Sequence, residues 1–230
     1  MINSKAYRFA SGRLLILARA PVAGSVKTRL AAVIGAGPAA EVHSELLRRT
    51  LDVALRARLA RLDLHVTEPG HPLFETLAAA GTLRVCRQQL GDLGARMHGA
   101  LCDALTDSEF AVLIGSDCPV MTGRYLAHAC AQLQAGTEVV VGPAEDGGYV
   151  LIGMRACRQA LFEAIPWGSA GVLQATRSRA RALRLSYAEL DVLWDVDTPA
   201  DLQRWRAQAD SDALSGQRLA SAQNPDQRSG

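Results

Sequence analysis

The sequence predicts a single three-layer α/β domain, in which a mostly parallel sheet lies between two layers of helices. Apolar runs of strand length alternate with segments of helical period over roughly 200 residues. The chain has 230 residues, of which 49% are hydrophobic, so it can bury one sizeable core. Residues 1–210 are therefore assigned to one domain, and the polar residues 211–230 are expected to form a disordered tail.

The first half of the chain shows the alternation clearly. The apolar run at 13–20 is typical of a strand buried on both faces, and the segment 37–58 carries apolar side chains at helical spacing. The run at 110–119 gives the strongest strand signal and ends abruptly at Pro119. Further strands are predicted at 62–68 and 82–88, and further helices at 74–81 and 95–106.

The second half continues with shorter elements. Helices are predicted at 123–135, 156–164 and about 169–182, and strands or core segments at 138–144, 149–154, 183–190 and 194–197. The dipeptide Thr198-Pro199 opens the last predicted helix, because proline is well placed at a first helical position.

Composition excludes several classes of partner. The net charge of +2 is too small for a nucleic-acid footprint or a polybasic membrane face, and aromatic residues make up only 5% of the chain. No stretch approaches the ~20 apolar residues that span a bilayer. We therefore expect no nucleic-acid or membrane partner, and composition leaves the oligomeric state open.

The five cysteines form no CxxC pair and are widely spaced. This pattern favours reduced thiols in a cytoplasmic protein over a disulfide framework or a zinc site. Cys118 is expected to be a packing residue. The cysteines are Cys86, Cys102, Cys118, Cys130 and Cys157.

Ligands of open α/β sheets bind beyond the carboxyl ends of the strands, so the residues that follow each strand are the candidates. After the first strand comes "APVAGSVKTRL" (20–30), in which Gly24 permits close backbone approach and Lys27 and Arg29 could neutralise a pyrophosphate. It is not a P-loop, because Pro21 and Val26 stand where that motif needs glycine. The alternative is a solvated basic turn.

Three acidic segments follow later strands. Asp117, in "GSDCP", could bind a divalent cation or cap the next turn. Glu145 and Asp146, in "GPAEDGGYVLIG", could face a cleft or form a plain acidic hairpin. In "LWDVDTPADL", Asp195 or Asp197 could be a second metal ligand or a helix N-cap, a role for which Thr198 competes.

These motifs, together with "GDLGARM" (91–97), resemble a bacterial GT-A-like (Rossmann-like) family of nucleotide-diphospho-sugar transferases over roughly residues 13–205. Its members include arsenosugar-biosynthesis and selenodomain-associated glycosyltransferases. The chain is more distantly similar to phospholactate guanylyltransferase and the molybdopterin nucleotidyltransferases.

The resemblance implies a nucleotide-phosphate site and a Mg²⁺ or Mn²⁺ site. The nucleotide site comprises Arg19, where the family more often has lysine, with Gly24, Lys27, Thr28 and Arg29, and the metal ligands are Asp117 and Asp197. The segment "SDC" lacks the full Asp-x-Asp of many glycosyltransferases.

The expected reaction is glycosyl transfer from a nucleotide sugar to a small-molecule acceptor. Asp146, or Glu145 in its place, would be the general base, and Trp167 either lines the acceptor side or is buried in the core. Nucleotidyl transfer, with release of pyrophosphate, is the rival reaction. The third hypothesis is a nucleotide-binding protein without catalysis.

Overall fold

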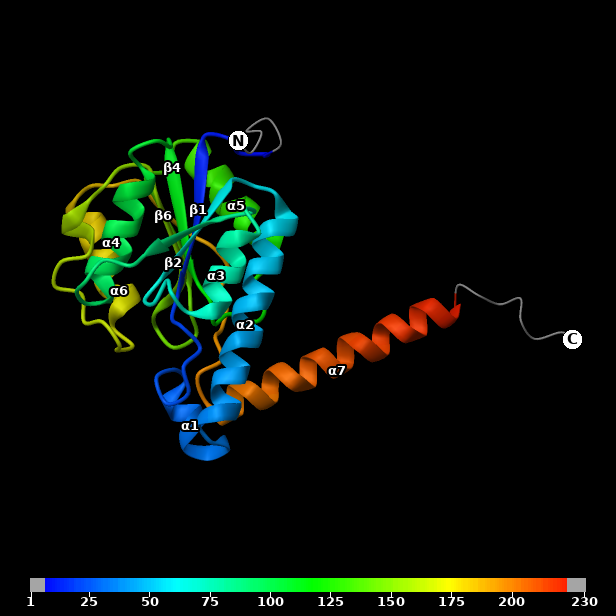
Figure 1. Cartoon of the computed structure of the whole chain (residues 1–230). Helices are drawn as coiled ribbons and strands as arrows, with labels where there is room; N and C mark the ends of the chain where they lie inside the picture. The colour runs from blue at the N-terminus through cyan, green and yellow to red at the C-terminus, as the bar shows by residue number, and fades with distance from the viewer. Residues whose placement is uncertain (1–6, 223–230) are drawn as a thin grey trace, which may run out of the picture.

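A computed structural model describes residues 7–222, and it confirms the α/β class (Figure 1). One seven-stranded sheet has the order β3-β2-β1-β4-β6-β5-β7. The neighbouring strands pair in parallel, except that β6 is antiparallel to both β4 and β5. The strands are β1 (Gly12–Ala18), β2 (Arg61–Val66), β3 (Arg84–Arg87), β4 (Phe110–Gly115), β5 (Val139–Pro143), β6 (Tyr149–Met154) and β7 (Tyr187–Glu189).

Helices cover both faces of this sheet. One face packs against α2 (Ala36–Ala57), α3 (Pro72–Ala79) and α5 (Gly123–Gln134). The other packs against α4 (Leu93–Ala104), α6 (Val172–Ala182) and the short 3₁₀ turn η2 (Gln159–Leu161). At one end of the domain, α1 (Thr28–Ile34) and α7 (Pro199–Ala222) enclose a smaller third cluster (Figure 1).

The apolar run of β1 explains the three layers. Successive strand side chains point to opposite faces, so Leu14 and Ile16 join the cluster beneath α2, whereas Leu15 joins the cluster beneath α4. All three side chains are almost fully buried. A strand of continuous hydrophobicity is thus stable only with a helical layer on each side.

The predicted helix at 156–164 is wrong. Only the 3₁₀ turn η2 forms there, and Ala164 follows with a φ of 51°, a conformation that interrupts a right-handed helix. The segment 194–197 is a core segment, as predicted, and not a strand. Trp194 and Val196 are buried, and an isolated bridge joins the preceding Leu193 to Ala144. Its backbone instead bonds to the loop after β4, where Val196 N–H donates to the Asp117 carbonyl.

The last helix is longer than expected. It runs to Ala222, so residues 211–222 are helical rather than a disordered tail, and 223–230 lie outside the described residues. Alanine, leucine, glutamine and arginine recur there, and all four favour helix. Thr198 caps this helix in a reciprocal arrangement with Asp201, which accepts from Thr198 N–H at 2.7 Å. Asp195 and Asp197 are therefore not needed as caps.

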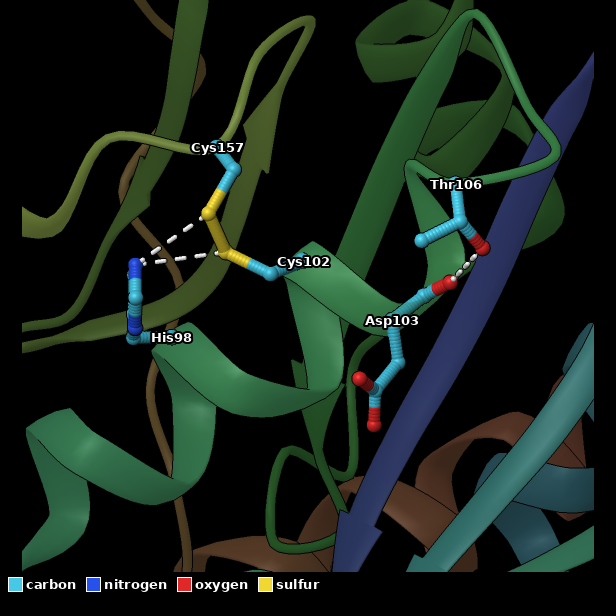
Figure 2. Close-up of a disulfide and its surroundings, with 5 residues drawn as sticks. All are labelled: His98, Cys102, Asp103, Thr106 and Cys157. Carbon is cyan, nitrogen blue, oxygen red and sulfur yellow. Dashed lines mark hydrogen bonds between the residues drawn. A yellow bond between two sulfur atoms is a disulfide. The ribbon is translucent and has the colours of Figure 1, made fainter.

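The cysteine prediction needs a correction. Cys102 on α4 and Cys157 in the loop after β6 form a disulfide, with Cα atoms 5.0 Å apart (Figure 2). The two residues are 55 positions apart in sequence and become neighbours only because β6 lies beside β4. Cys86, Cys118 and Cys130 are free. Within residues 7–222, no helix combines the length and the hydrophobicity that a membrane span needs.

Candidate functional site

The carboxyl ends of β1 and β4 lie side by side and open into a cleft of about 670 Å³. The loop after each strand, the β5–β6 hairpin and the segment before α7 supply part of its lining. The start of α4, the segment 167–172 and His43 on α2 complete it. Every predicted site residue except Gly24 and Glu145 lines this cleft. The predicted site residues that line the cleft are Arg19, Lys27, Thr28, Arg29, Asp117, Asp146 and Asp197.

A buried ion pair joins the two central loops. Lys27 Nζ donates to Asp117 Oδ1 at 2.9 Å and to the Val196 carbonyl at 2.7 Å. The Lys27 side chain is only 5% exposed, whereas that of Asp117 is 39% exposed and faces the cleft. An ammonium has three protons, so two are accounted for by these bonds. Lys27 therefore connects three distant parts of the chain and orients Asp117.

His43 on α2 completes this arrangement, and no sequence motif marked it. Its Nε2 lies 3.1 Å from the Arg19 carbonyl and its Nδ1 lies 3.5 Å from Asp117 Oδ1. Burial alone would raise the pKa of Asp117, but the Lys27 charge and the His43 contact outweigh it and hold that pKa well below its usual range. Asp117 is thus an anion at any physiological pH.

Lys27 also has an unusual backbone. It precedes α1 with φ 49° and ψ 46°, in the left-handed region that side chains other than glycine and asparagine rarely adopt. Such conformations cost roughly 1–3 kcal/mol and persist where the surroundings fix them. Here the two hydrogen bonds of the buried ammonium fix it. Gly24, with φ 82°, gives the same loop its turn but does not line the cleft.

Arg29 and Asp197 form a second pair at the rim. Arg29 donates to Asp197 Oδ2 at 3.0 Å, and the two side chains are 73% and 44% exposed. Exposed pairs of this kind contribute little to stability. Both groups therefore stay available to a ligand. The metal-binding role of Asp197 remains a prediction.

Asp195 is the carboxylate whose importance the sequence left open. It lines the cleft, and burial, together with the charges of Asp146 and Asp117, raises its pKa to about 6. Asp195 is thus repelled by Asp117 and Asp146 in a cavity that Asp197 also lines. Among residues 7–222, these carboxylates do not converge into one tight coordination sphere.

The two acidic residues of the β5–β6 hairpin point in different directions. Asp146 lines the cleft and accepts from Gly148 N–H at 2.8 Å, whereas Glu145 forms a two-bond pair with Arg204 at 2.7 and 2.9 Å. Gly147 follows them with φ 87°, and a Cβ there would lie 2.3 Å from the Ala170 carbonyl oxygen. This turn requires glycine, and it directs only Asp146 inward.

The opposite wall is basic and partly aromatic. Arg96 on α4 donates to Gln88 at 3.4 Å, and burial and the charge of Arg19 lower its pKa. Sequence reasoning missed Arg96, although it lies within the quoted motif GDLGARM. Trp167 lines this wall and is partly exposed, packed so closely on Gly94 that a Cβ there would lie 2.5 Å from the indole nitrogen. It also packs against the core cluster beneath α4, and its place on the acceptor side stays a prediction.

Comparisons with known proteins agree with this architecture. The DUF2064 family, described as an uncharacterized protein conserved in bacteria, matches residues 50–169. A solved structure from Desulfovibrio desulfuricans G20, named a "putative nucleotide-diphospho-sugar transferase", is 34% identical, with a TM-score of 0.76 and 84% of each chain covered.

More distant structures share the fold alone. Rv0371c from Mycobacterium tuberculosis H37Rv, solved in complex with manganese, is 22% identical, with a TM-score of 0.52 and coverage of 85% of this chain and 97% of that one. The inositol-1-phosphate CTP transferase from T. maritima is 16% identical, with a TM-score of 0.54 and coverage of 87% and 94%. No curated protein sequence matches the chain significantly.

The first prediction concerns the buried pair. Asp117→Asn should lower the free energy of unfolding by about 2 kcal/mol, because it leaves the Lys27 ammonium buried without its charged partner. The double variant Lys27→Met/Asp117→Asn should lose less than the sum of the two single variants. Denaturant unfolding measures all three. The exposed pair is the matched control: Arg29→Met/Asp197→Asn should change stability by no more than about 0.5 kcal/mol. Additive losses at Lys27 and Asp117 would contradict this account.

The second prediction uses Asp195. Its raised pKa means that the folded protein binds this proton more tightly than the unfolded chain, so stability falls as pH rises from about 4 to about 6. Asp195→Asn should therefore stabilise the fold by about 1–2 kcal/mol near pH 8, with partial solvent screening allowed for, and by almost nothing near pH 4. Unfolding curves at the two pH values test this. A variant less stable than the wild type near pH 8 would refute it.

Proposed function

The chain belongs to the DUF2064 family, and on that premise we propose that it is a metal-dependent glycosyltransferase that uses a nucleotide-diphospho-sugar donor and a small-molecule acceptor. The observation that carries the proposal is the convergence of Lys27, Arg29 and Asp117 on one cleft at the carboxyl ends of β1 and β4. Cations and an ionised carboxylate at one point suit a diphosphate bound with a divalent cation.

The carboxylates of the cleft fit Mg²⁺ or Mn²⁺. These hard ions are held by one or two carboxylates, water and substrate phosphates rather than by closed cages of protein ligands. Asp117 is already ionised. A dication would neutralise the negative charge of Asp117, Asp146 and Asp195 and so relieve their mutual repulsion. Asp117 would hold the ion, with Asp195 or Asp197 as the second ligand. The bound ion would supply charge stabilisation at the leaving diphosphate.

The residues of the cleft would divide the remaining work. Arg29 at the rim and Arg19 and Arg96 on the facing wall would bind phosphate oxygens, to which the planar guanidinium donates two parallel bonds. Lys27 would act mainly through Asp117, because its ammonium is buried and already bonded. Asp146 would accept the proton of the acceptor hydroxyl as general base, and the Trp167 face would pack against the acceptor.

Nucleotidyl transfer is the second candidate, and one observation favours it. Three guanidinium groups, those of Arg19, Arg29 and Arg96, line the cleft, and the longer phosphate chain of a nucleoside triphosphate could contact all three. The two reactions differ in product. Glycosyl transfer releases a nucleoside diphosphate, and nucleotidyl transfer releases pyrophosphate. If the protein only binds nucleotides, neither product forms.

The function is tested by ligand screening followed by product analysis. Nucleotide sugars and nucleoside triphosphates are screened by thermal shift with and without Mn²⁺, and a ligand at 100 times its Kd should add about 2.7 kcal/mol of stability. The stabilising donor is then incubated with candidate acceptors. Release of nucleoside diphosphate supports the proposal, whereas release of pyrophosphate or no release with any donor overturns it.

The third prediction separates the two acidic residues of the hairpin. Asp146→Asn should lower kcat by roughly 100-fold or more, since it removes the general base, while the thermal shift produced by the donor stays similar. Glu145→Gln is the matched control, because this neighbouring carboxylate faces Arg204 outside the cleft and should leave kcat within about twofold. Equal losses in both variants would rule out the assigned role of Asp146.

A further inference from the structure

A second cluster of reactive side chains lies outside the cleft. His98 and Cys102 stand one turn apart on α4, and Cys157 reaches them from the loop after β6 (Figure 2). The His98 Nε2 lies 3.2 Å from the Cys102 sulfur and 3.3 Å from the Cys157 sulfur. Phe162 packs against His98 on one side and against Trp167 on the other, which separates the cluster from the cleft.

We propose that, once the disulfide is reduced, His98, Cys102 and Cys157 form a binding site for a thiolate-preferring divalent cation of the zinc class. Among residues 7–222, this is the only set of three or more potential metal-binding side chains whose ligand atoms all lie within 4.8 Å of one another. One imidazole nitrogen and two thiolates are the donor set that zinc prefers over magnesium or calcium. The site is independent of the hard-ion site proposed for the cleft.

The distances fit a tetrahedral ion. With the metal about 2.0 Å from nitrogen and about 2.3 Å from each sulfur, nitrogen and sulfur lie roughly 3.5 Å apart, close to the 3.2 and 3.3 Å found here. The two sulfurs must separate from a bonded distance of about 2 Å to about 3.8 Å. Cys157 is exposed, so rotation of its side chain gives the necessary room. The imidazole nitrogen already lies at a nearly equal distance from both sulfurs.

Within the described part of the chain, three protein ligands are available, so a fourth position is open. Asp103 follows Cys102 on α4, but its carboxylate points away from the sulfurs (Figure 2). Water or a small ligand would therefore complete the coordination, as in zinc sites that exchange a ligand. An exposed ligand at Cys157 also means that the ion can enter from solvent without opening the domain.

Reduction of the disulfide would prepare the site for the cation, and oxidation would release it. A dithiol reductant transfers two electrons and two protons to the Cys102–Cys157 disulfide, which gives two thiols and leaves the reductant as its own disulfide. Binding of the cation then releases the two thiol protons to solvent. An oxidant that removes two electrons from the metal-bound thiolates re-forms the disulfide and frees the ion. The structure shows the oxidised form, in which the two sulfurs are bonded to each other and cannot bind the cation as thiolates.

The fourth prediction is tested by the absorption spectrum of bound Co²⁺. Bonds between Co²⁺ and thiolate give a charge-transfer band that oxygen ligands do not give. The full chain is reduced, freed of reductant and chelator without oxygen, and titrated with Co²⁺. We expect one equivalent to give this absorption, and Zn²⁺ to displace it. Cys102→Ser and Cys157→Ser should abolish the band. His98→Ala should weaken binding by at least the roughly 10–100-fold that outer-shell changes cost.

Cys86→Ser is the matched control, because Cys86 is a partly exposed free thiol on β3 and should leave the band unchanged. A second measurement needs no variant: oxidation of the zinc-loaded protein with diamide should release one Zn²⁺ per disulfide formed, detected with a chromophoric chelator. Absence of the thiolate band in reduced wild type, or its survival in Cys102→Ser, overturns the proposal. Failure of the reductant to yield two alkylatable thiols in addition to those already free in the folded protein also overturns it, since the disulfide would then be purely structural.

Discussion

The buried contact between Lys27 and Asp117 is the constraint on which the cleft depends. It joins the loop after β1 to the loop after β4, and the second bond of the same ammonium fixes the segment that carries Asp195 and Asp197. A charge so deeply buried is tolerated only while its partners stay in place. The left-handed backbone of Lys27 is a consequence, because the side chain must turn inward at the start of α1. Mutual dependence of this kind keeps three loops of different origin in one geometry.

The cleft collects charged residues from several loops at one edge of the sheet. The loop after β4, the hairpin turn and the segment before α7 place their carboxylates together, while Arg19 and Arg96 stand on the facing wall. The strand order makes this possible, since β6 runs antiparallel between β4 and β5 and so brings its hairpin to the carboxyl end of β4. A polyanion with a bound cation would meet both walls at once. Neither wall alone would contact both the anion and its cation.

The central strands and the edge of the sheet that carries the cleft could be predicted from the sequence. The apolar runs mark β1 and β4 because both faces of these strands are covered, and the polar residues after them mark the edge at which ligands bind. The side-chain directions of Glu145 and Asp146 could not be predicted, because a glycine turn and a distant arginine decide them. His43 was missed because a buried histidine on a helix has no local signature. Cys102 and Cys157 were missed because their proximity follows from strand order rather than from spacing.

The last helix leaves the body of the domain and extends away from it (Figure 1). Its first turns are anchored by Leu202 and Trp205 beside Val196, and the residues immediately before it line the cleft. At about 1.5 Å per residue, the 24-residue helix α7 is about 36 Å long, and it begins two residues after Asp197. The length of α7 therefore separates any group attached at its far end from the acidic side of the cleft.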